Sequence, residues 1–321
     1  MTPRVSIAMA TYNGARYLPE QLRSFCMQTR MPDELVACDD GSTDETLKIL
    51  EAFRKDAPFK VVVESNPVNL GFTRNFELAL TKCTGDLIFL CDQDDIWLQC
   101  KIERMLAAFA ANPEKTVLIH DAALVNHEMV RSDVSSFSQV RSGFGSDDHV
   151  TTGALTALRR EFMLISLPIP EGIVGHDIWV HGLAKLLDTR LVVNESLQFL
   201  RRHSANTSDW IGASLHPISR LNVLVHHYKT PIAQNYSDRV HINESLRNRL
   251  HWLQASRAAF ASGVLARGLV SLAAERQALA GRTRLIGDPP LRRRLLAVRF
   301  LLSGHYRHFN GLGSFLRDIS R

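Results

Sequence analysis

The sequence predicts an α/β protein with a mostly parallel sheet flanked by helices, followed by a helical C-terminal region. Near-continuous apolar segments alternate with amphipathic ones through the first 120 residues. This alternation is typical of parallel strands that helices cover on both faces. From about residue 212 onward, apolar residues recur at helical spacing with arginines between them. We therefore expect two regions, residues 1–210 and residues 211–321.

Each apolar run predicts a strand, and the amphipathic segments between the runs predict helices. The strands are expected over residues 4–10, 34–40, 59–65, 86–92 and 116–126, and the helices over 17–28, 43–55, 72–83 and 96–112. The Ser- and Gly-rich residues 127–149 predict a loop. Farther along, we expect a strand at 150–158, a helix at 175–188 and a strand, a turn and a second strand over 190–203.

The charge is divided unevenly along the chain. Residues 211–321 carry 17 Lys and Arg against 5 Asp and Glu, whereas residues 1–210 carry 21 against 28. An acidic first region argues against a nucleic-acid groove there, while the basic region could face anionic lipid, nucleic acid or another protein. We expect no nucleic-acid partner for the chain as a whole.

The five cysteines all lie within the first 100 residues and form no CxxC pair. This pattern indicates reduced thiols in a cytosolic protein rather than a disulfide framework. The N-terminal MTPRVSIAMATYNG lacks the apolar core and cleavage site of a signal peptide. No run of about 18 apolar residues predicts a membrane span. We therefore expect a cytoplasmic location.

Asp92, Asp94 and Asp95 place three carboxylates in four positions directly after an apolar run. If the strand geometry continues, Asp92 and Asp94 project to the same side. Oxygen ligands of this kind suit Mg²⁺ or Mn²⁺, which are typically held by one or two carboxylates and the substrate's phosphates. Alternatively, Asp94 or Asp95 caps a helix that begins at Ile96, and we expect Asp95 to be this cap.

Other polar clusters also allow a structural and a functional interpretation. Ser42 and Glu45 fit a capping box, which leaves Asp40 to accept the N3–H of a pyrimidine base. Asp177 is either a first-turn helix acid or a general base.

The cations of Arg201–His203 could meet a diphosphate or a metal, or could form a solvated rim. The chain lacks the GxGxxG, GxxxxGK[ST], GxSxG and HExxH patterns. Their absence argues against nicotinamide-dependent, P-loop, serine-hydrolase and zinc-protease chemistry.

Four segments in order together resemble the family-2 glycosyltransferases of the GT-A type. They are VSIAMATYNGARYLPEQLRSFCMQT, DDGSTDET, NLGFTRNFELAL and GDLIFLCDQDDIW, and the resemblance covers about residues 4–205. The DQDDIW form, with GHDIWVHGLA and LRRHSANTS, is similar to the rhamnosyltransferase-like branch. That branch builds cell-surface polysaccharides from nucleotide sugars.

The resemblance implies an inverting, metal-dependent transfer from a nucleoside diphosphate sugar, and it assigns roles to residues. Asp177 would be the catalytic base. The donor would be bound by Ala10, Thr11, Tyr12, Asp40, Arg74, Asn75, Asp92 and Gln93. Asp92, Asp94 and His203 would bind Mg²⁺ or Mn²⁺, and Thr152, Gly153, His176 and Trp179 would contact the acceptor. Many relatives have Glu-Asp where this chain has His176 and Asp177.

By the same resemblance, dTDP-rhamnose is the first expected donor, followed by a UDP-hexose or a UDP-N-acetylhexosamine. The acceptor would be a hydroxyl of a cell-surface polysaccharide or of a lipid-linked saccharide. The basic C-terminal helices would contact the cytoplasmic face of a membrane, or else form a solvated bundle or a homodimer surface. A nucleotidyltransferase and a non-catalytic nucleotide-sugar binder are the alternative classes of function.

Overall fold

The computed structural model describes residues 2–203, 214–229, 232–256 and 260–320. The chain divides into two compact units, Met1–Ile218 and Ser219–Arg321. The boundary expected between residues 210 and 211 lies outside the described residues, as does the SANTS segment at 204–208.

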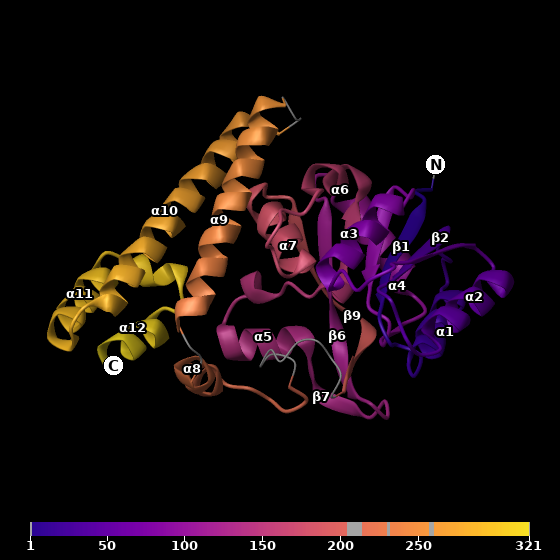
Figure 1. Ribbon diagram of the computed structural model, residues 1–321, viewed down its shortest axis with the longest axis horizontal. Coiled ribbons are helices and arrows are strands. Elements are labelled where there is room, and N and C mark those ends of the chain that lie inside the picture. Colours follow the sequence, from indigo (N-terminus) through magenta and orange to yellow (C-terminus); the bar gives the residue numbers. More distant parts are fainter. Residues whose placement is uncertain (1, 204–213, 230–231, 257–259, 321) are drawn as a thin grey trace. The chain divides into compact units, whose positions relative to one another are not determined.

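A nine-stranded sheet lies at the centre of the described part of the first unit (Figure 1). Its strands follow the order β3 (Lys60–Ser65), β2 (Glu34–Asp39), β1 (Val5–Thr11), β4 (Leu87–Cys91), β8 (Thr156–Arg159), β6 (Val117–Asn126), β9 (Arg190–Arg202) and β5 (Ile96–Trp97), and β7 (Arg131–Ser135) pairs with β6. Strands β1 to β4 pair in parallel, whereas β8 runs antiparallel to both neighbours. The sheet is therefore mixed, with a parallel part where the sequence predicts one.

The helices that connect the parallel strands cover the sheet. They are α1 (Leu18–Cys26), α2 (Thr46–Asp56), α3 (Phe72–Lys82) and α4 (Lys101–Ala111). Helix α3 packs on β1 and β2, and α2 packs on β3. Every residue of β2 and β4 is buried, which explains why β4 and the middle of β2 are apolar on both faces. One core cluster joins Phe25 of α1, Phe89 of β4 and Phe109 of α4.

The segment 127–149, expected as a loop, contains β7, helix α5 (Ser136–Phe144) and a 3-10 turn at Asp147–His149. Phe137 and Val140 of α5 are buried in a cluster with residues of β6. Ser135 caps the helix reciprocally with Ser138, each hydroxyl accepting from the other residue's backbone N–H. The loop prediction is wrong because serine is common both at helix N-caps and in turns, so the serines of this segment do not distinguish the two from sequence alone.

Beyond this segment, the structure shortens one expected strand and joins two others. The strand expected at 150–158 begins only at Thr156, after a 3-10 turn at Gly153–Leu155, and is followed by α6 (Arg160–Ser166) and α7 (His176–Leu186). The strand, turn and strand expected over 190–203 form the single strand β9, whose register with β6 shifts near Asp121.

The helix expected from Ile96 begins instead at Lys101, because Ile96 belongs to β5 and pairs with β9. The Asp95 carboxylate holds this pairing by accepting hydrogen bonds from the Arg201 backbone N–H and the Gln198 side-chain amide, both at 2.9 Å. Asp95 is therefore not a helix cap, and that prediction is wrong.

The capping box expected at Ser42 and Glu45 is also absent from this part of the described chain, since α2 begins at Thr46 without a side-chain cap. The Ser42 hydroxyl and backbone N–H both donate to the Asp39 carboxylate instead, at 2.5 and 2.8 Å. Asp44 satisfies the Thr46 backbone N–H at 3.0 Å.

The second unit is helical in its described residues. It contains α8 (Arg220–Lys229), α9 (Ile232–Ala255), α10 (Ser262–Gly287), α11 (Pro290–Leu302), a 3-10 turn at His305–His308 and α12 (Leu312–Ser320). Helices α9 and α10 form a long pair, and α11 packs against α10 and α12 (Figure 1). Across the described residues of both units, no helix combines the length and apolarity needed to cross a membrane.

A buried ion pair fastens α12 to α10. Arg282 donates two hydrogen bonds of 2.9 Å to the Asp318 carboxylate, and the Tyr306 hydroxyl donates a third at 2.8 Å. The side chains of Arg282 and Asp318 are almost completely buried. Removing one member of such a pair destabilises a protein strongly, because the remaining charge stays buried without compensation.

Replacing Asp318 by alanine should therefore lower the free energy of unfolding of the second unit by about 3–5 kcal/mol. Hydrogen exchange of the α10 and α12 amides, followed by mass spectrometry, measures this loss. Asp238→Ala is the matched control, since Asp238 is exposed on α9. Equal protection in the two variants would contradict a stabilising role for the buried pair.

Candidate active site

A cavity of about 1670 Å³ lies at the carboxyl ends of β1, β2 and β4 in the first unit. The N-terminal residues of α3 and α7 and the end of β9 complete its wall. Parallel strands end at the same edge of a sheet, so the polar residues that follow β1, β2 and β4 meet there.

Most of the site residues predicted from the sequence line this cavity. They are Ala10, Thr11, Tyr12, Asp40, Asn75, Asp92, Gln93, Asp94, Thr152, Gly153, His176, Asp177 and His203. The residues expected to bind donor, metal and acceptor thus share one space, although they come from segments far apart in the sequence.

Arg74 and Trp179 are not among the lining residues, and their expected roles need correction. The Arg74 guanidinium donates to the backbone oxygens of Ile169 and Pro170 at 2.7 and 3.1 Å. Trp179 is completely buried, and its indole N–H donates to the Ser166 backbone oxygen at 2.7 Å. Both side chains hold the 166–170 segment against α3 and α7 instead of contacting a ligand.

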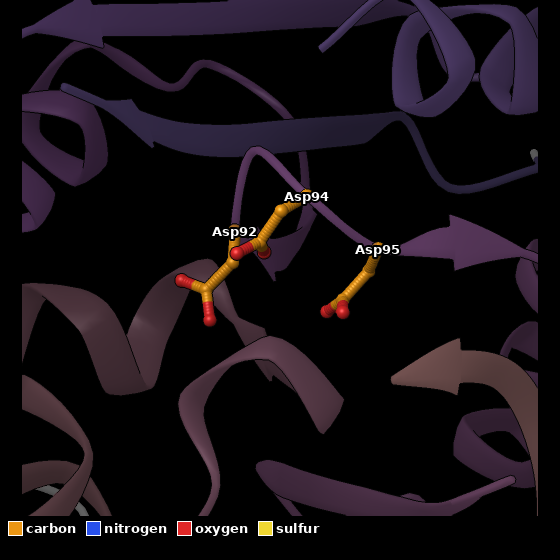
Figure 2. A group of neighbouring side chains, drawn as sticks. All are labelled: Asp92, Asp94 and Asp95. Atoms are coloured by element: carbon orange, nitrogen blue, oxygen red, sulfur yellow. The ribbon is translucent and has the colours of Figure 1, made fainter. Parts of the chain in front are cut away.

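Asp92, Asp94 and Asp95 gather their carboxylates at the end of β4 (Figure 2). One oxygen from each residue lies within 4.8 Å of the others. Carboxylate oxygens at this spacing are the ligands that a hard divalent cation prefers. The residues present therefore fit Mg²⁺ or Mn²⁺.

The crowding changes the proton affinity of the cluster. Burial, together with the negative charges of Asp94 and Asp177, raises the pKa of Asp92 to about 7, against the opposing effect of Lys101 and Arg202. Burial also raises the pKa of Asp95 well above its ordinary value. A divalent cation between these groups would offset the repulsion and favour their ionised forms.

Lys101 lies behind the cluster, in a position that the sequence does not reveal. Its ammonium donates to the Gln198 side-chain oxygen at 2.6 Å and lies 3.7 Å from the centroid of the Trp97 ring. The other end of the Gln198 amide donates to Asp95. Burial lowers the pKa of Lys101 to about 7. Gln198 is thereby held in one orientation, with its N–H groups toward the acids.

His203 contacts the cluster directly, its Nε2 lying 2.8 Å from a carboxylate oxygen of Asp94. The Tyr17 ring stacks on the imidazole with centroids 4.6 Å apart. Arg201 is buried and donates to the Asp94 backbone oxygen at 2.8 Å, and its guanidinium carbon lies 4.5 Å from the centroid of the Tyr17 ring. Arg201 is thus a buried support of the site and not a solvated rim residue, and both Arg201 and Arg202 line the cavity.

Asp40 organises the loop before α3. Its carboxylate accepts hydrogen bonds from the backbone N–H groups of Leu70 and Gly71 at 2.8 and 2.9 Å, and from the Asn66 amide at 2.9 Å. Asn75 accepts from the same Asn66 amide at 3.0 Å. A carboxylate has about four acceptor positions, so a base N–H would add a fourth donor to an oxygen pair that is already engaged.

Gln93 fixes the turn after β1. Its side-chain oxygen accepts from the Tyr12 backbone N–H and its amide donates to the Tyr12 oxygen, both at 2.9 Å. A Cβ on Gly14 would come within 2.1 Å of the Gln93 oxygen. A side chain at this position would displace the Gln93 amide from Tyr12, which is half exposed and lines the cavity.

Asp177 and His176 begin α7 at the opposite wall of the cavity. His176 is buried 3.9 Å from the centroid of the Phe76 ring, and both of its nitrogens lack a hydrogen-bond partner among the described residues. A Cβ on Gly153 would come within 2.4 Å of its Nε2. Burial lowers the pKa of His176, so the imidazole is neutral beside Asp177.

An α/β sheet of this topology, with acids at its carboxyl edge and helices after it, is the GT-A fold of glycosyltransferases. Residues 6–161 match the family model of glycosyl transferase family 2. Just under half of the chain is thus similar to this family, and the chain is a glycosyltransferase.

Three similar proteins show how far the likeness extends. An uncharacterized glycosyltransferase of Nostoc sp. is 26% identical over 272 residues, which cover 77% of this chain and 81% of the relative. Abequosyltransferase RfbV of Salmonella typhimurium is 32% identical over 93 residues, 28% of each chain. The crystal structure of S. aureus TarS in complex with UDP-GlcNAc has a TM-score of 0.59 at 17% identity, covering 99% of this chain and 91% of that one. The TarS likeness establishes the fold.

The pKa of Asp92 gives a test of the crowded site. An unfolded aspartate has a pKa of about 3.9, whereas the folded state raises that of Asp92 to about 7. The folded state therefore binds the proton more tightly, and the free energy of unfolding falls as pH rises from about 4 to about 7.

Asp92→Asn removes this penalty. In metal-free buffer, the variant should exceed the wild type in free energy of unfolding by at least about 1 kcal/mol at pH 8 and by much less at pH 4.5. Urea unfolding at the two pH values measures the difference. Asp56→Asn, at an exposed aspartate of α2, is the control. A stability difference between Asp92→Asn and the wild type that does not change with pH would disprove the repulsion.

Proposed function

We propose that the chain is an inverting, metal-dependent glycosyltransferase that moves a sugar from a nucleoside diphosphate donor to a hydroxyl group. One observation carries the proposal: the Asp92–Asp94–Asp95 cluster and Asp177 line a single cavity at the carboxyl edge of the sheet. The cluster supplies ligands for a cation, and Asp177 supplies a carboxylate for proton transfer. The cluster follows β4 and Asp177 lies in the first turn of α7, so the two groups reach the same cavity from different elements and the two substrates would bind there.

Asp92 and Asp94 would hold Mg²⁺ or Mn²⁺, with Asp95 behind them and His203 in contact with Asp94. The bound cation would act as a Lewis acid that stabilises the departing nucleoside diphosphate. Asp95 accepts hydrogen bonds from Gln198 and Arg201, so it would serve as a support for its two neighbours. The cation of Arg202 lines the same wall and would attract the negatively charged donor.

Asp177 would be the general base. A carboxylate accepts the proton of the acceptor hydroxyl as the hydroxyl oxygen attacks the anomeric carbon, and such a base contributes about 10²–10⁴-fold in rate. Attack from the side opposite the leaving diphosphate inverts the anomeric centre. His176, Thr152 and Gly153 form the wall beside Asp177 and would shape the acceptor position.

For the donor, we propose dTDP-rhamnose first, and a UDP-hexose or UDP-N-acetylhexosamine second. The nucleoside would be surrounded by Ala10, Thr11, Tyr12, Asn75 and Gln93, and Asp40 would lie beside its pyrimidine base. TarS was solved with UDP-GlcNAc, and the Salmonella relative is an abequosyltransferase, so pyrimidine nucleotides carrying either a hexosamine or a deoxyhexose belong in the donor screen.

The acceptor would be a cell-surface polysaccharide or a lipid-linked saccharide. A protein that acts on such acceptors in the cytoplasm benefits from contact with the membrane, and the basic C-terminal helices would provide it. A homodimer through the same helices is the alternative use of this region.

Two other classes of function have weaker support. A nucleotidyltransferase would share the acidic metal site but usually has a Gly-rich loop with Lys or Arg after the first strand, where this chain has MATYNGARY. A non-catalytic nucleotide-sugar binder would not need a carboxylate at Asp177. Release of free nucleoside diphosphate with formation of a glycosidic bond distinguishes the proposed transferase from both.

Asp94→Ala should abolish Mn²⁺- or Mg²⁺-dependent transfer while the protein stays folded, because a carboxylate ligand is lost from the cluster. Transfer assays and isothermal titration with MnCl₂ provide the two readouts. Asp86→Ala, an exposed aspartate at the far end of β4, is the control. Full activity with unchanged Mn²⁺ affinity would refute the metal assignment.

Asp177→Asn should lower kcat by at least about 100-fold and leave donor affinity largely unchanged, because the amide keeps the shape but cannot accept the proton. Steady-state kinetics and donor titration measure the two effects. A rise in KM with an unchanged kcat would show that Asp177 binds substrate and is not the base.

The donor itself is best found by thermal shift with dTDP- and UDP-sugars, each with and without Mn²⁺. A donor that binds the cavity should raise the melting temperature more strongly in the presence of the cation. Stabilisation by every nucleotide sugar to the same extent, without dependence on the cation, would argue against the proposed function.

A further inference from the structure

Helix α11 has one face that is buried within the second unit. Ala297 on this face is fully buried. Phe300 packs on α10 at Gly281, where an added Cβ would come within 2.9 Å of the phenyl ring. These contacts anchor the helix and fix which of its side chains face outward.

The outward face of α11 is apolar. Leu291, Leu295, Val298 and Leu302 expose 78%, 71%, 45% and 82% of their surfaces. Their spacing of four, three and four residues places them in one line along the helix. This α11 stripe is a continuous row of exposed apolar side chains, which monomeric proteins in water seldom display without a binding role.

Arginines border the stripe on both sides. At 100° per residue, Arg292 and Arg299 lie to one side of the stripe and Arg294 lies to the other. The helix carries four arginines and no acidic residue over its 13 positions. Arginine stems can lie along an apolar surface while their guanidinium groups reach toward anions.

We infer that the α11 stripe docks on an anionic membrane surface. The helix would lie in the plane of the interface, with its leucines among the acyl chains and its flanking guanidinium groups at the lipid phosphates. An amphipathic helix with apolar residues on one face and arginines beside them has the composition of such interfacial segments. Each basic residue near an anionic surface strengthens the attraction, and salt weakens it.

A second copy of the same chain is a poorer occupant for this face. In a two-fold dimer, each stripe would meet its own equivalent, and the bordering arginines of the two copies would face one another. No acidic side chain of α11 could neutralise them. Asp288, directly before α11, lies 3.5 Å from Arg292, and a surface of anionic lipid would supply negative charge to the other bordering arginines.

The purpose of this docking rests on the proposed function, since a tethered enzyme meets a lipid-linked acceptor at a higher effective concentration. The docking itself needs neither donor nor acceptor. It is therefore testable on its own, with vesicles alone, and donor binding is testable in the absence of lipid.

The experiment uses the full-length chain and two sets of vesicles, phosphatidylcholine alone and phosphatidylcholine with 30% phosphatidylglycerol. Co-sedimentation is measured at low and high NaCl for four proteins. They are the wild type, the triple variant Leu291→Ser/Leu295→Ser/Leu302→Ser, the triple variant Arg292→Gln/Arg294→Gln/Arg299→Gln, and Val270→Ser. Val270 is the matched control, because it is an apolar residue of α10 with 70% exposure.

We expect the wild type and Val270→Ser to bind the anionic vesicles at least tenfold more strongly than the neutral ones, with loss at high salt. Either triple variant should bind the anionic vesicles at least tenfold more weakly than the wild type, while its circular dichroism spectrum and its donor affinity stay unchanged. If the leucine variant fails to fold, the vesicle affinity of the arginine variant and the salt dependence of wild-type binding still test the inference.

Equal binding to both vesicle types, or unchanged binding in the arginine variant, would overturn the inference. A dimer of the wild type in light scattering, converted to a monomer by the leucine substitutions, would also overturn it in favour of self-association. If the wild type binds anionic vesicles but binds no nucleotide-sugar donor, this result would contradict only the proposed function.

Discussion

Asp92, Asp94 and Asp95 bring three carboxylate oxygens within 4.8 Å of one another at the end of β4. Burial, with the negative charges of Asp94 and Asp177, raises the pKa of Asp92 to about 7. The surrounding structure is arranged to tolerate this charge. Lys101 is buried behind the acids, Gln198 is held by Lys101, and Asp95 accepts hydrogen bonds from Gln198 and β9. These contacts offset part of the negative charge of the three carboxylates, and a bound divalent cation would neutralise the rest.

The same constraint explains the local irregularities of the fold. The hydrogen bonds of Asp95 hold β5 against β9, and α4 therefore begins at Lys101 and not at Ile96. With this start, the Lys101 side chain lies next to the acidic cluster, 3.7 Å from the centroid of the Trp97 ring. The second wall of the cavity is equally constrained, because Gly153 leaves room for His176 at the start of α7. Both walls are thus held by packed and hydrogen-bonded side chains, which preorganises the cavity.

The sequence predicts what depends on local pattern. The alternation of apolar runs and amphipathic helices locates β1 to β4, and the polar residues after those runs locate Asp40, Asp92 and Asp94 at the cavity. It does not predict contacts between residues about a hundred positions apart, such as Asp95 with Gln198. Nothing in the sequence indicates that Lys101 is buried, yet the structure buries it. Arg74 is predicted to contact the donor, but its guanidinium group donates to the backbone oxygens of residues 169 and 170.

Anomalous scattering from crystals soaked with Mn²⁺ and a pyrimidine nucleoside diphosphate tests directly whether the acidic cluster binds a divalent cation. We expect one strong manganese peak at the cluster, with oxygens of Asp94, of Asp92 and of the diphosphate as ligands. A diphosphate bound in the cavity without manganese beside it, under conditions that support transfer, would contradict the claim that a divalent cation resolves the carboxylate crowding.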